Sequence, residues 1–195
     1  MYGKEEIGMS RIGKTPIVLP ENVTVDVSDT NYVTVTGPKG KLEQQITGNI
    51  SVTRGEHEGK NAIILVANDE LADTNAKHGL YRALLHNMVV GVSQGFTKSV
   101  SVNGVGFKVQ VQGNKIVMNI GFSHPVNVEI PAGLTVTCPS ATEMVISGIS
   151  KEQVGQFAAD IKAIKKVEPY HGYGIYYTNE HVRRKEIKKT SSGKK

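Results

Sequence analysis

An internal repeat constrains the fold of this chain more than any other feature of its sequence. When the chain is aligned with itself so that Pro20 meets Pro131, Gly37 meets Gly148 at the same offset. Alternating apolar residues also align: Ile17, Leu19, Val23, Val25, Val33 and Val35 match Val128, Ile130, Leu134, Val136, Met144 and Ile146. Alternation of this kind is typical of half-buried strands. We therefore interpret the chain as an internal duplication.

A helix is expected to close each copy of the repeat. In the second copy it begins at once, with "SKEQVGQFAADIKAIKK", where Ser150 and Gln153 fit a capping box. The apolar residues of this stretch lie on one helical face: Val154, Phe157, Ala158, Ile161 and Ile164. In the first copy a longer segment comes before the helix, with three further strand candidates, "KLEQQI", "ISVTR" and "NAIILVA".

The first helix is then expected from about Glu70 to Val92, with Leu80, Leu84 and Met88 forming its buried stripe and Gly95 ending it. Strand candidates follow it as well. The predicted fold is α+β, with two similar small domains, each a mainly antiparallel sheet packed against one helix, and an extended basic C-terminal tail. The predicted boundaries are 1–82 (with a flexible leader), 83–177 and 178–195.

Positive charge is concentrated at the C-terminal end of the chain. Residues 1–150 hold 12 Lys and Arg against 13 Asp and Glu, whereas residues 151–195 hold 11 against 5. A basic end on a nearly neutral body is typical of a contact with a polyanion, most often nucleic acid. The alternative is a solvated tail without a partner.

The sequence offers no catalytic or cofactor motif. The "GVGF" stretch at Gly104–Phe107 lacks the third glycine of a dinucleotide site, and "GPKG" at Gly37–Gly40 lacks the Walker spacing. His78 and His86 lie eight residues apart on the expected first helix, but no carboxylate or cysteine joins them at metal-ligand spacing. Cys138, the single cysteine, is expected to be a small apolar strand residue in a reducing compartment. We predict a non-enzymatic cytoplasmic protein with no cofactor, no metal, no membrane segment and no small-molecule substrate.

The stretch "EPYHGYGIYY" (Glu168–Tyr177) suits contact with RNA. Gly172 and Gly174 let the backbone approach a phosphate closely, while tyrosine rings stack on bases and their hydroxyls bond to phosphate oxygens. A basic tail follows directly, and aromatic and cationic residues together favour RNA. The alternative is that the tyrosines pack onto the second helix.

Several long stretches resemble the bacterial large-subunit ribosomal protein L-six family. They cover nearly the whole chain: "MSRIGKTPIVLP", "VTVTGPKGKL", "HGLYRALLHNMVVGVSQGFTKSVSVNGVGFK", "GFSHPV" and "VGQFAADIKAIKKVEPYHGYGI". The resemblance implies a duplicated fold and a structural protein that binds 23S rRNA, mainly through its C-terminal domain. It also implies a site near the sarcin–ricin loop, with translation factors and other large-subunit ribosomal proteins as neighbours.

The chain departs from the family at its end motif, which is usually Pro-Tyr-Lys-Gly-Lys-Gly. Here His171 and Tyr173 replace the two lysines, and Tyr176 replaces a common arginine. We predict that cations of the tail compensate for this loss and that the tyrosines supply stacking. The full set of predicted rRNA-binding residues is Tyr170, His171, Gly172, Tyr173, Gly174, Tyr176, Arg183, Arg184, Lys185, Lys188 and Lys189, with Arg11 and Lys14 of the leader.

Two other functions are compatible with the residues taken without the resemblance. The first is a free-standing RNA-binding regulator of related fold, which would need no ribosome. The second is a protein-interaction module that recruits partners through its sheet edges, the basic tail being incidental.

Overall fold

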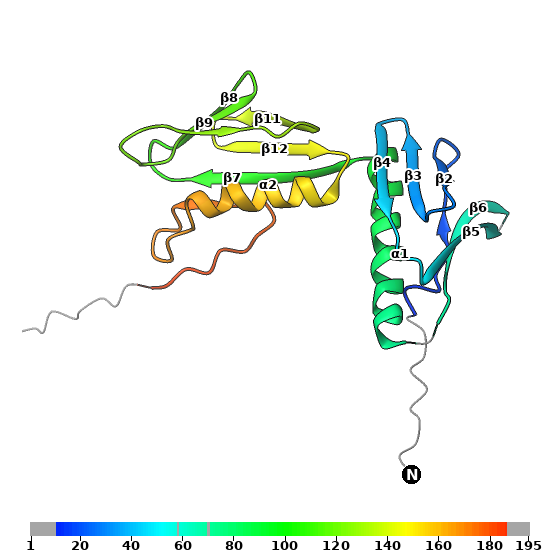
Figure 1. Ribbon diagram of the computed structural model, residues 1–195. Helices are drawn as coiled ribbons and strands as arrows, with labels where there is room; N and C mark the ends of the chain where they lie inside the picture. Colours follow the sequence, from blue (N-terminus) through cyan, green and yellow to red (C-terminus); the bar gives the residue numbers. More distant parts are fainter. Residues whose placement is uncertain (1–10, 58, 70, 187–195) are drawn as a thin grey trace, which may run out of the picture. The chain divides into compact units, whose positions relative to one another are not determined.

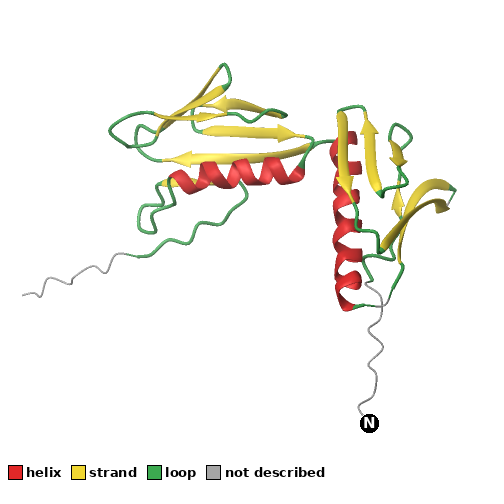
Figure 2. Ribbon diagram, in the orientation of Figure 1, coloured by secondary structure: helices red, strands yellow, loops and turns green. Residues whose placement is uncertain are grey.

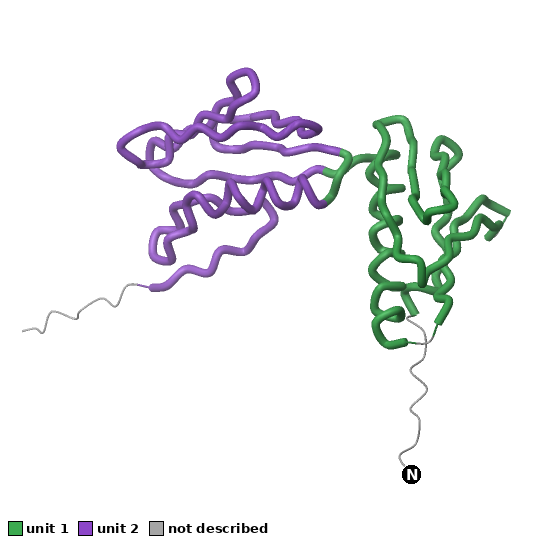
Figure 3. The backbone as a smooth tube through the Cα atoms, viewed as in Figure 1, with its two compact units in different colours: residues 1–96, 149–151 green, residues 97–148, 152–195 purple. Residues whose placement is uncertain are grey.

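The computed structural model describes residues 11–57, 59–69 and 71–186, and the chain divides into two compact units (Figures 1 and 3). Unit 1 comprises Met1–Phe96 and Ile149–Lys151, and unit 2 comprises Thr97–Gly148 and Glu152–Lys195. Both units combine antiparallel strands with one long helix each (Figure 2). The predicted duplicated α+β fold is therefore confirmed.

Within the described residues, unit 1 is built from two small sheets and the helix α1. The sheets have the strand orders β1-β6-β5 and β2-β3-β4. Its elements are β1 (Ile17–Val18), β2 (Thr24–Val27), β3 (Tyr32–Gly37), β4 (Gly40–Gln45), β5 (Ile50–His57), β6 (Lys60–Ala67) and α1 (Ala72–Ser93).

Unit 2 is built in the same way and gains one strand from the C-terminal stretch. Its sheets have the orders β10-β9-β8 and β11-β12-β7-β13. Its elements are β7 (Phe96–Asn103), β8 (Lys108–Gln112), β9 (Lys115–Asn119), β10 (Val126–Glu129), β11 (Leu134–Ser140), β12 (Glu143–Gly148), α2 (Lys151–Ile164) and β13 (Gly174–Tyr177). The first residue of β7 and the first of α2 are counted with unit 1.

Strand register confirms the repeat that the sequence predicts. Val25 pairs with Val35 between β2 and β3, and Val136 pairs with Ile146 between β11 and β12. Val136 and Ile146 follow Val25 and Val35 by the same number of residues as Pro131 follows Pro20. Because side chains alternate between the faces of a sheet, equal register puts the same apolar set into each core.

Chain order differs between the units although their pairings agree. In the sheets of unit 2, β7 takes the place that β4 has in unit 1. The β8–β9 hairpin likewise takes the place of β5–β6, and β10 takes the place of β1. Along the chain, β7, β8 and β9 precede β10 in unit 2, whereas their counterparts β4, β5 and β6 follow β3 in unit 1. This cyclic shift explains why β4, β5 and β6 separate the repeat from α1, whereas no strand separates it from α2.

The buried face of α1 differs from the predicted stripe. Met88 is buried, but Leu80 is 54% exposed and Leu84 is only half-buried. Steps of four residues drift round a helix by about 40° each, so a stripe made of such steps leaves the core-facing side. The observed stripe mixes steps of three and four: His78, Leu85, Met88, Val89 and Val92. The predicted end is confirmed, since Gly95 has φ 78° and its N–H bonds to Val90 O.

The predicted domain boundary between residues 82 and 83 is wrong. It would cut α1, whose residues pack against β3, β4 and β6 of unit 1 as one continuous helix. In the structure, unit 1 ends at Phe96 and takes in Ile149–Lys151 on the return of the chain. On the second helix, the predicted residues Val154, Phe157, Ala158 and Ile161 are buried, and Ile164 is half-buried.

Candidate nucleic-acid interface

A tight turn after α2 is organised by one carboxylate. Glu168 accepts hydrogen bonds from the backbone N–H groups of Tyr170 (3.0 Å) and His171 (2.8 Å), and the Nδ1 atom of His171 lies 3.2 Å away. The N–H of His171, followed by that of Tyr170 and the ring of His171, holds the pKa of Glu168 below its ordinary value. The backbone closes the turn with bonds from Gly172 N to Glu168 O and from Glu168 N to Tyr173 O, both 2.9 Å.

Both glycines of the turn are required by the backbone. Gly172 has φ +74°, a left-handed conformation that side chains disfavour. A Cβ on Gly174 would stand 2.7 Å from the Cα of Val167, so the chain passes too close for any side chain. After Gly174 the chain enters β13, which pairs antiparallel with β7 from Gly174↔Asn103 to Tyr177↔Val100.

The first part of the basic tail folds back onto this turn. Lys185 N donates to Pro169 O at 2.8 Å, so residues 170–184 form a closed loop. Arg184 lies against Gly172, with its Nε 2.8 Å from the place where a Cβ would stand. The exposed cations Arg183, Arg184 and Lys185 therefore lie beside the turn that carries His171 and Tyr173.

The tyrosines divide into two groups. Tyr170 and Tyr173 are 50% and 39% exposed, and the Tyr173 ring stacks on His171 with ring centroids 5.4 Å apart. Tyr176 and Tyr177 lie in β13 and are half-buried. The ring of Tyr177 has the ammonium groups of Lys98 and Lys162 at 4.3 and 4.6 Å from its centroid.

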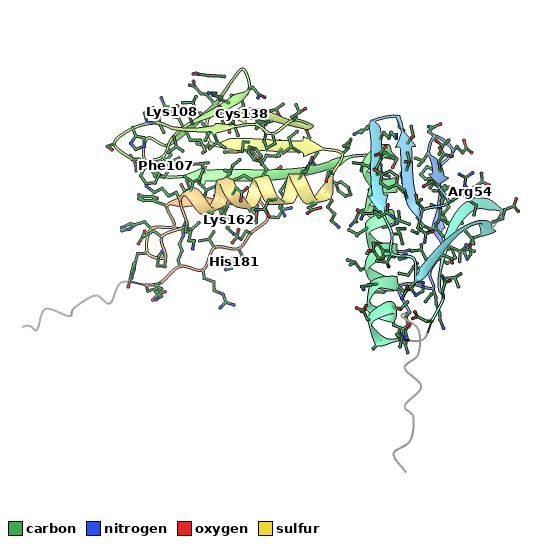
Figure 4. The ribbon with its side chains drawn as sticks, viewed as in Figure 1. Arg54, Phe107, Lys108, Cys138, Lys162 and His181 are labelled. Atoms are coloured by element: carbon green, nitrogen blue, oxygen red, sulfur yellow. The ribbon has the colours of Figure 1, made fainter. Side chains whose placement is uncertain are left out.

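An ion pair ties the tail to α2 beside Tyr177. Lys162 Nζ lies 2.7 and 2.6 Å from the two carboxylate oxygens of Glu180, and Tyr177 N donates to Glu180 Oε2 at 3.2 Å. Lys162 extends from α2 near the segment that carries His181 (Figure 4). This ammonium, followed by the N–H of Tyr177, lowers the pKa of Glu180.

A second lysine, Lys165, directly follows α2 and contacts two loops. Lys165 Nζ donates to Ile120 O at 2.6 Å and lies 4.9 Å from the ring centroids of both Phe107 and Phe122. Its own carbonyl accepts the N–H of Ile175 at 2.9 Å. Lys165 thus fixes the loops beside β13 rather than offering a free charge.

The structure brings most of the predicted site residues of unit 2 together. The exposed residues of the turn and the tail form one basic and aromatic surface, which we call the turn–tail surface: Tyr170, His171, Tyr173, Arg183, Arg184 and Lys185. Gly172 and Gly174 of the turn are buried, and Tyr176 lies next to this surface in β13. Arg11 and Lys14 belong to unit 1, where both are exposed. Lys188 and Lys189 lie outside the described residues.

Sequence reasoning missed Lys98, Asn103 and Glu180. Asn103 Nδ2 donates to Gly172 O at 3.2 Å, which links β7 to the turn. No local pattern marks these residues. Lys98 and Asn103 lie on β7, which meets β13 only in the folded unit, and Glu180 meets Lys162 of α2. Lys162 had a signal, since it lies on the polar face of the predicted second helix.

The described part of the chain contains no group of three or more His, Cys, Asp and Glu placed to hold a metal, and none of its helices has the length and apolarity to span a membrane. Cys138 lies half-buried in β11, and burial raises the pKa of its thiol.

Comparison with known proteins gives one consistent family. The family model described as "Ribosomal protein L6" matches residues 19–95 and 103–178, one match in each unit. Similar curated proteins, each named "Large ribosomal subunit protein uL6", come from Clostridium kluyveri (48% identical), Clostridioides difficile (47%) and Dictyoglomus thermophilum (45%). Each comparison covers 187 residues, 96% of this chain and 100% of the relative.

Proposed function

Because the chain belongs to the ribosomal protein L6 family, we propose that it is a structural component of the large ribosomal subunit that binds 23S rRNA through the turn–tail surface of unit 2. Its family consists of ribosomal structural proteins, not enzymes. Its partners are rRNA and other proteins of the large subunit.

The observation that carries this proposal is the contact between Arg184 and Gly172. The family's usual motif has a lysine on each side of this glycine, and the chain has His171 and Tyr173 instead. A guanidinium from the tail lies over Gly172, between these two positions. Arginine binds phosphate with two parallel hydrogen bonds, so it supplies the cation that the turn itself lacks.

The rings and cations of the turn–tail surface have separate parts in this proposal. Arg183, Arg184 and Lys185, with Lys188 and Lys189 further along the tail, neutralise backbone phosphates. Tyr170, Tyr173 and Tyr176, with His171, stack on exposed bases or sugars. Gly172 and Gly174 are buried, so they serve the site by giving the turn its shape. In unit 1, Arg11 and Lys14 add a second, smaller contact with phosphate.

We further propose that the bound rRNA lies near the sarcin–ricin loop, beside the site where translation factors dock. This assignment rests on the resemblance of nearly the whole chain to the family. In this position the protein supports subunit assembly and the shape of the factor site, without chemistry of its own.

The test is binding of the full chain to 23S rRNA transcribed in vitro, measured against salt concentration. The variant Arg183→Gln/Arg184→Gln/Lys185→Gln removes three cations from the turn–tail surface. Its log–log slope should be shallower by about 2, taking roughly 0.7–0.9 for each phosphate contact. The matched control, Arg54→Gln/Lys60→Gln/Lys77→Gln, removes the same charge from unit 1 and should leave the slope unchanged.

Equal slopes for these two variants would contradict the assignment of the turn–tail surface. A second variant, Lys188→Gln/Lys189→Gln, tests the two lysines beyond the described residues and should also make the slope shallower. Co-sedimentation of the chain with large subunits in high salt distinguishes a ribosomal component from a free-standing RNA-binding regulator, which would not co-sediment.

A further inference from the structure

The carboxylate of Glu180 occupies a place that is built to hold an anion. Both of its oxygens lie within 2.7 Å of Lys162 Nζ, and Oε2 also accepts the backbone N–H of Tyr177. The ammonium group of Lys98 lies 4.3 Å from the ring centroid of Tyr177 and acts electrostatically on the same carboxylate. The ammonium group of Lys162 and the N–H of Tyr177 therefore hold the carboxylate directly, and a second ammonium group, that of Lys98, lies on the neighbouring Tyr177 ring.

This anion site is accessible from solvent. The side chains of Lys162 and Glu180 are 30% and 34% exposed, so neither is buried in the core. Ion pairs of this exposure contribute little to stability, because solvent screens them. An external anion can therefore exchange with the carboxylate at small cost.

We propose that Glu180 occupies this site as an internal substitute for phosphate, and that an RNA backbone phosphate displaces it when unit 2 binds RNA. The inference rests on the proposed function, since it adds a phosphate contact to the same RNA interface. The ligand is a phosphodiester oxygen, which bonds ammonium and N–H groups as a carboxylate does. Lys162, Lys98 and the Tyr177 N–H are the groups that receive it.

A different role for Glu180 makes opposite predictions. If the Lys162–Glu180 pair is only a clamp that holds the tail in place, its loss weakens RNA binding, because Arg183 and Arg184 lose their position. If Glu180 competes with phosphate, its loss strengthens binding. The sign of the change in affinity decides between the two roles.

The experiment compares Glu180→Gln with Glu186→Gln in the full chain, using 23S rRNA transcribed in vitro. Both variants remove one negative charge from the tail, and only the first removes it from the anion site. Glu180→Gln should bind about two- to fivefold more tightly than Glu186→Gln, as expected for the loss of one exposed competing ion pair. Its melting temperature should fall only slightly, because an exposed ion pair contributes little to stability.

Salt dependence gives a second readout. In the natural chain, phosphate binding at Lys162 releases one cation from the RNA. The displaced carboxylate of Glu180 takes up a cation from solution, so the two changes cancel and this contact adds nothing to the salt dependence of binding. In Glu180→Gln the release is no longer offset, and the log–log slope should steepen by about 0.7–0.9. The added substitution Lys162→Gln should cancel both the gain in affinity and the steeper slope.

A titration with inorganic phosphate tests the site without RNA. The backbone amide resonance of Tyr177 should shift on addition of phosphate in Glu180→Gln, and much less in Glu186→Gln. Equal shifts in the two variants, or binding of Glu180→Gln no tighter than that of Glu186→Gln, would overturn the inference. If the natural chain and all variants bind 23S rRNA no better than an unrelated RNA of equal length, the proposed function fails instead, whatever the phosphate titration shows.

Discussion

Arg184 lies against Gly172, with its Nε 2.8 Å from the place that a Cβ on this glycine would occupy. The two residues are brought together by the hydrogen bond from Lys185 N to Pro169 O, which returns the tail to the turn. Gly172 also has φ +74°, so the turn requires glycine at this position for two reasons: its backbone angle and the space that Arg184 occupies.

Substitution of Gly172 by alanine should therefore weaken RNA binding. The left-handed angle costs an alanine about 1–2 kcal/mol, and the methyl group displaces the guanidinium of Arg184. Affinity for 23S rRNA should fall and the salt slope should become shallower. Gly155→Ala is the control, because its Cβ meets nothing within 4 Å in α2 and should stabilise the helix by about 0.5–1 kcal/mol. Unchanged RNA affinity in Gly172→Ala would contradict the role of this contact.

Exposed rings of the turn–tail surface should contribute affinity that does not depend on salt. Tyr173→Ala removes a ring that stacks on His171 and is 39% exposed. If this ring stacks on a base, binding should weaken by about 1–3 kcal/mol, while the salt slope stays the same. Tyr176→Ala should cost less, because this ring is already half-buried in β13.

Tyr32→Ala is the matched control for the stacking experiment, since it removes a partly exposed tyrosine from unit 1. It should leave RNA affinity unchanged. If Tyr173→Ala behaves like this control, the tyrosine of the turn only packs within the protein.

The carboxylate of Glu168 should make stability depend on pH. Its pKa is held below the ordinary value of 4.5, chiefly by the N–H of His171. A lowered folded-state pKa means that the stabilisation is complete above the unfolded value and is lost as the pH falls through the folded value. Thermal melts should show natural chain and Glu168→Gln separated by a constant difference at neutral pH, which shrinks once the pH falls below 4.5.

Glu186→Gln removes a carboxylate from the tail and leaves Glu168 in place, and it serves as the control for this pH series. A separation between natural chain and Glu168→Gln that grows as the pH falls would contradict the expected sign.

Gly91 of α1 should tolerate no side chain. A Cβ at this position would stand 2.1 Å from the carbonyl oxygen of Ile149, which belongs to the same unit. Gly91→Ala should destabilise the protein by about 1–3 kcal/mol or more, since backbone must move to make room. Denaturant unfolding followed by circular dichroism measures this loss.

Gly48→Ala is the matched control, because its Cβ meets nothing within 4 Å. This change should stay within about 0.5 kcal/mol. Equal stabilities for the two variants would mean that the backbone at Ile149 can move away from α1 at little cost in free energy.

Sequence pattern alone determined the duplication, the strands and the second helix. Alternation of apolar residues marks the face of each strand that is buried. The fixed offset between the two copies predicts that they share one strand register, as the pairs Val25↔Val35 and Val136↔Ile146 do. Local chemistry also indicated the turn–tail surface, since glycine, tyrosine and basic residues follow one another along the chain.

Only the tertiary structure decided which strands take equivalent places and which charges meet. In unit 2, β7 takes the place of β4 because of pairings between distant segments, and no local sequence pattern predicts this exchange. The buried stripe of α1 depends on the sheet it faces, which is why Leu80 lies exposed. Glu180 meets Lys162, and Arg184 meets Gly172, because β13 pairs with β7 and the tail then folds back on the turn. A sequence gives each residue its chemistry and its neighbours along the chain, whereas contacts of this kind depend on how the whole unit folds.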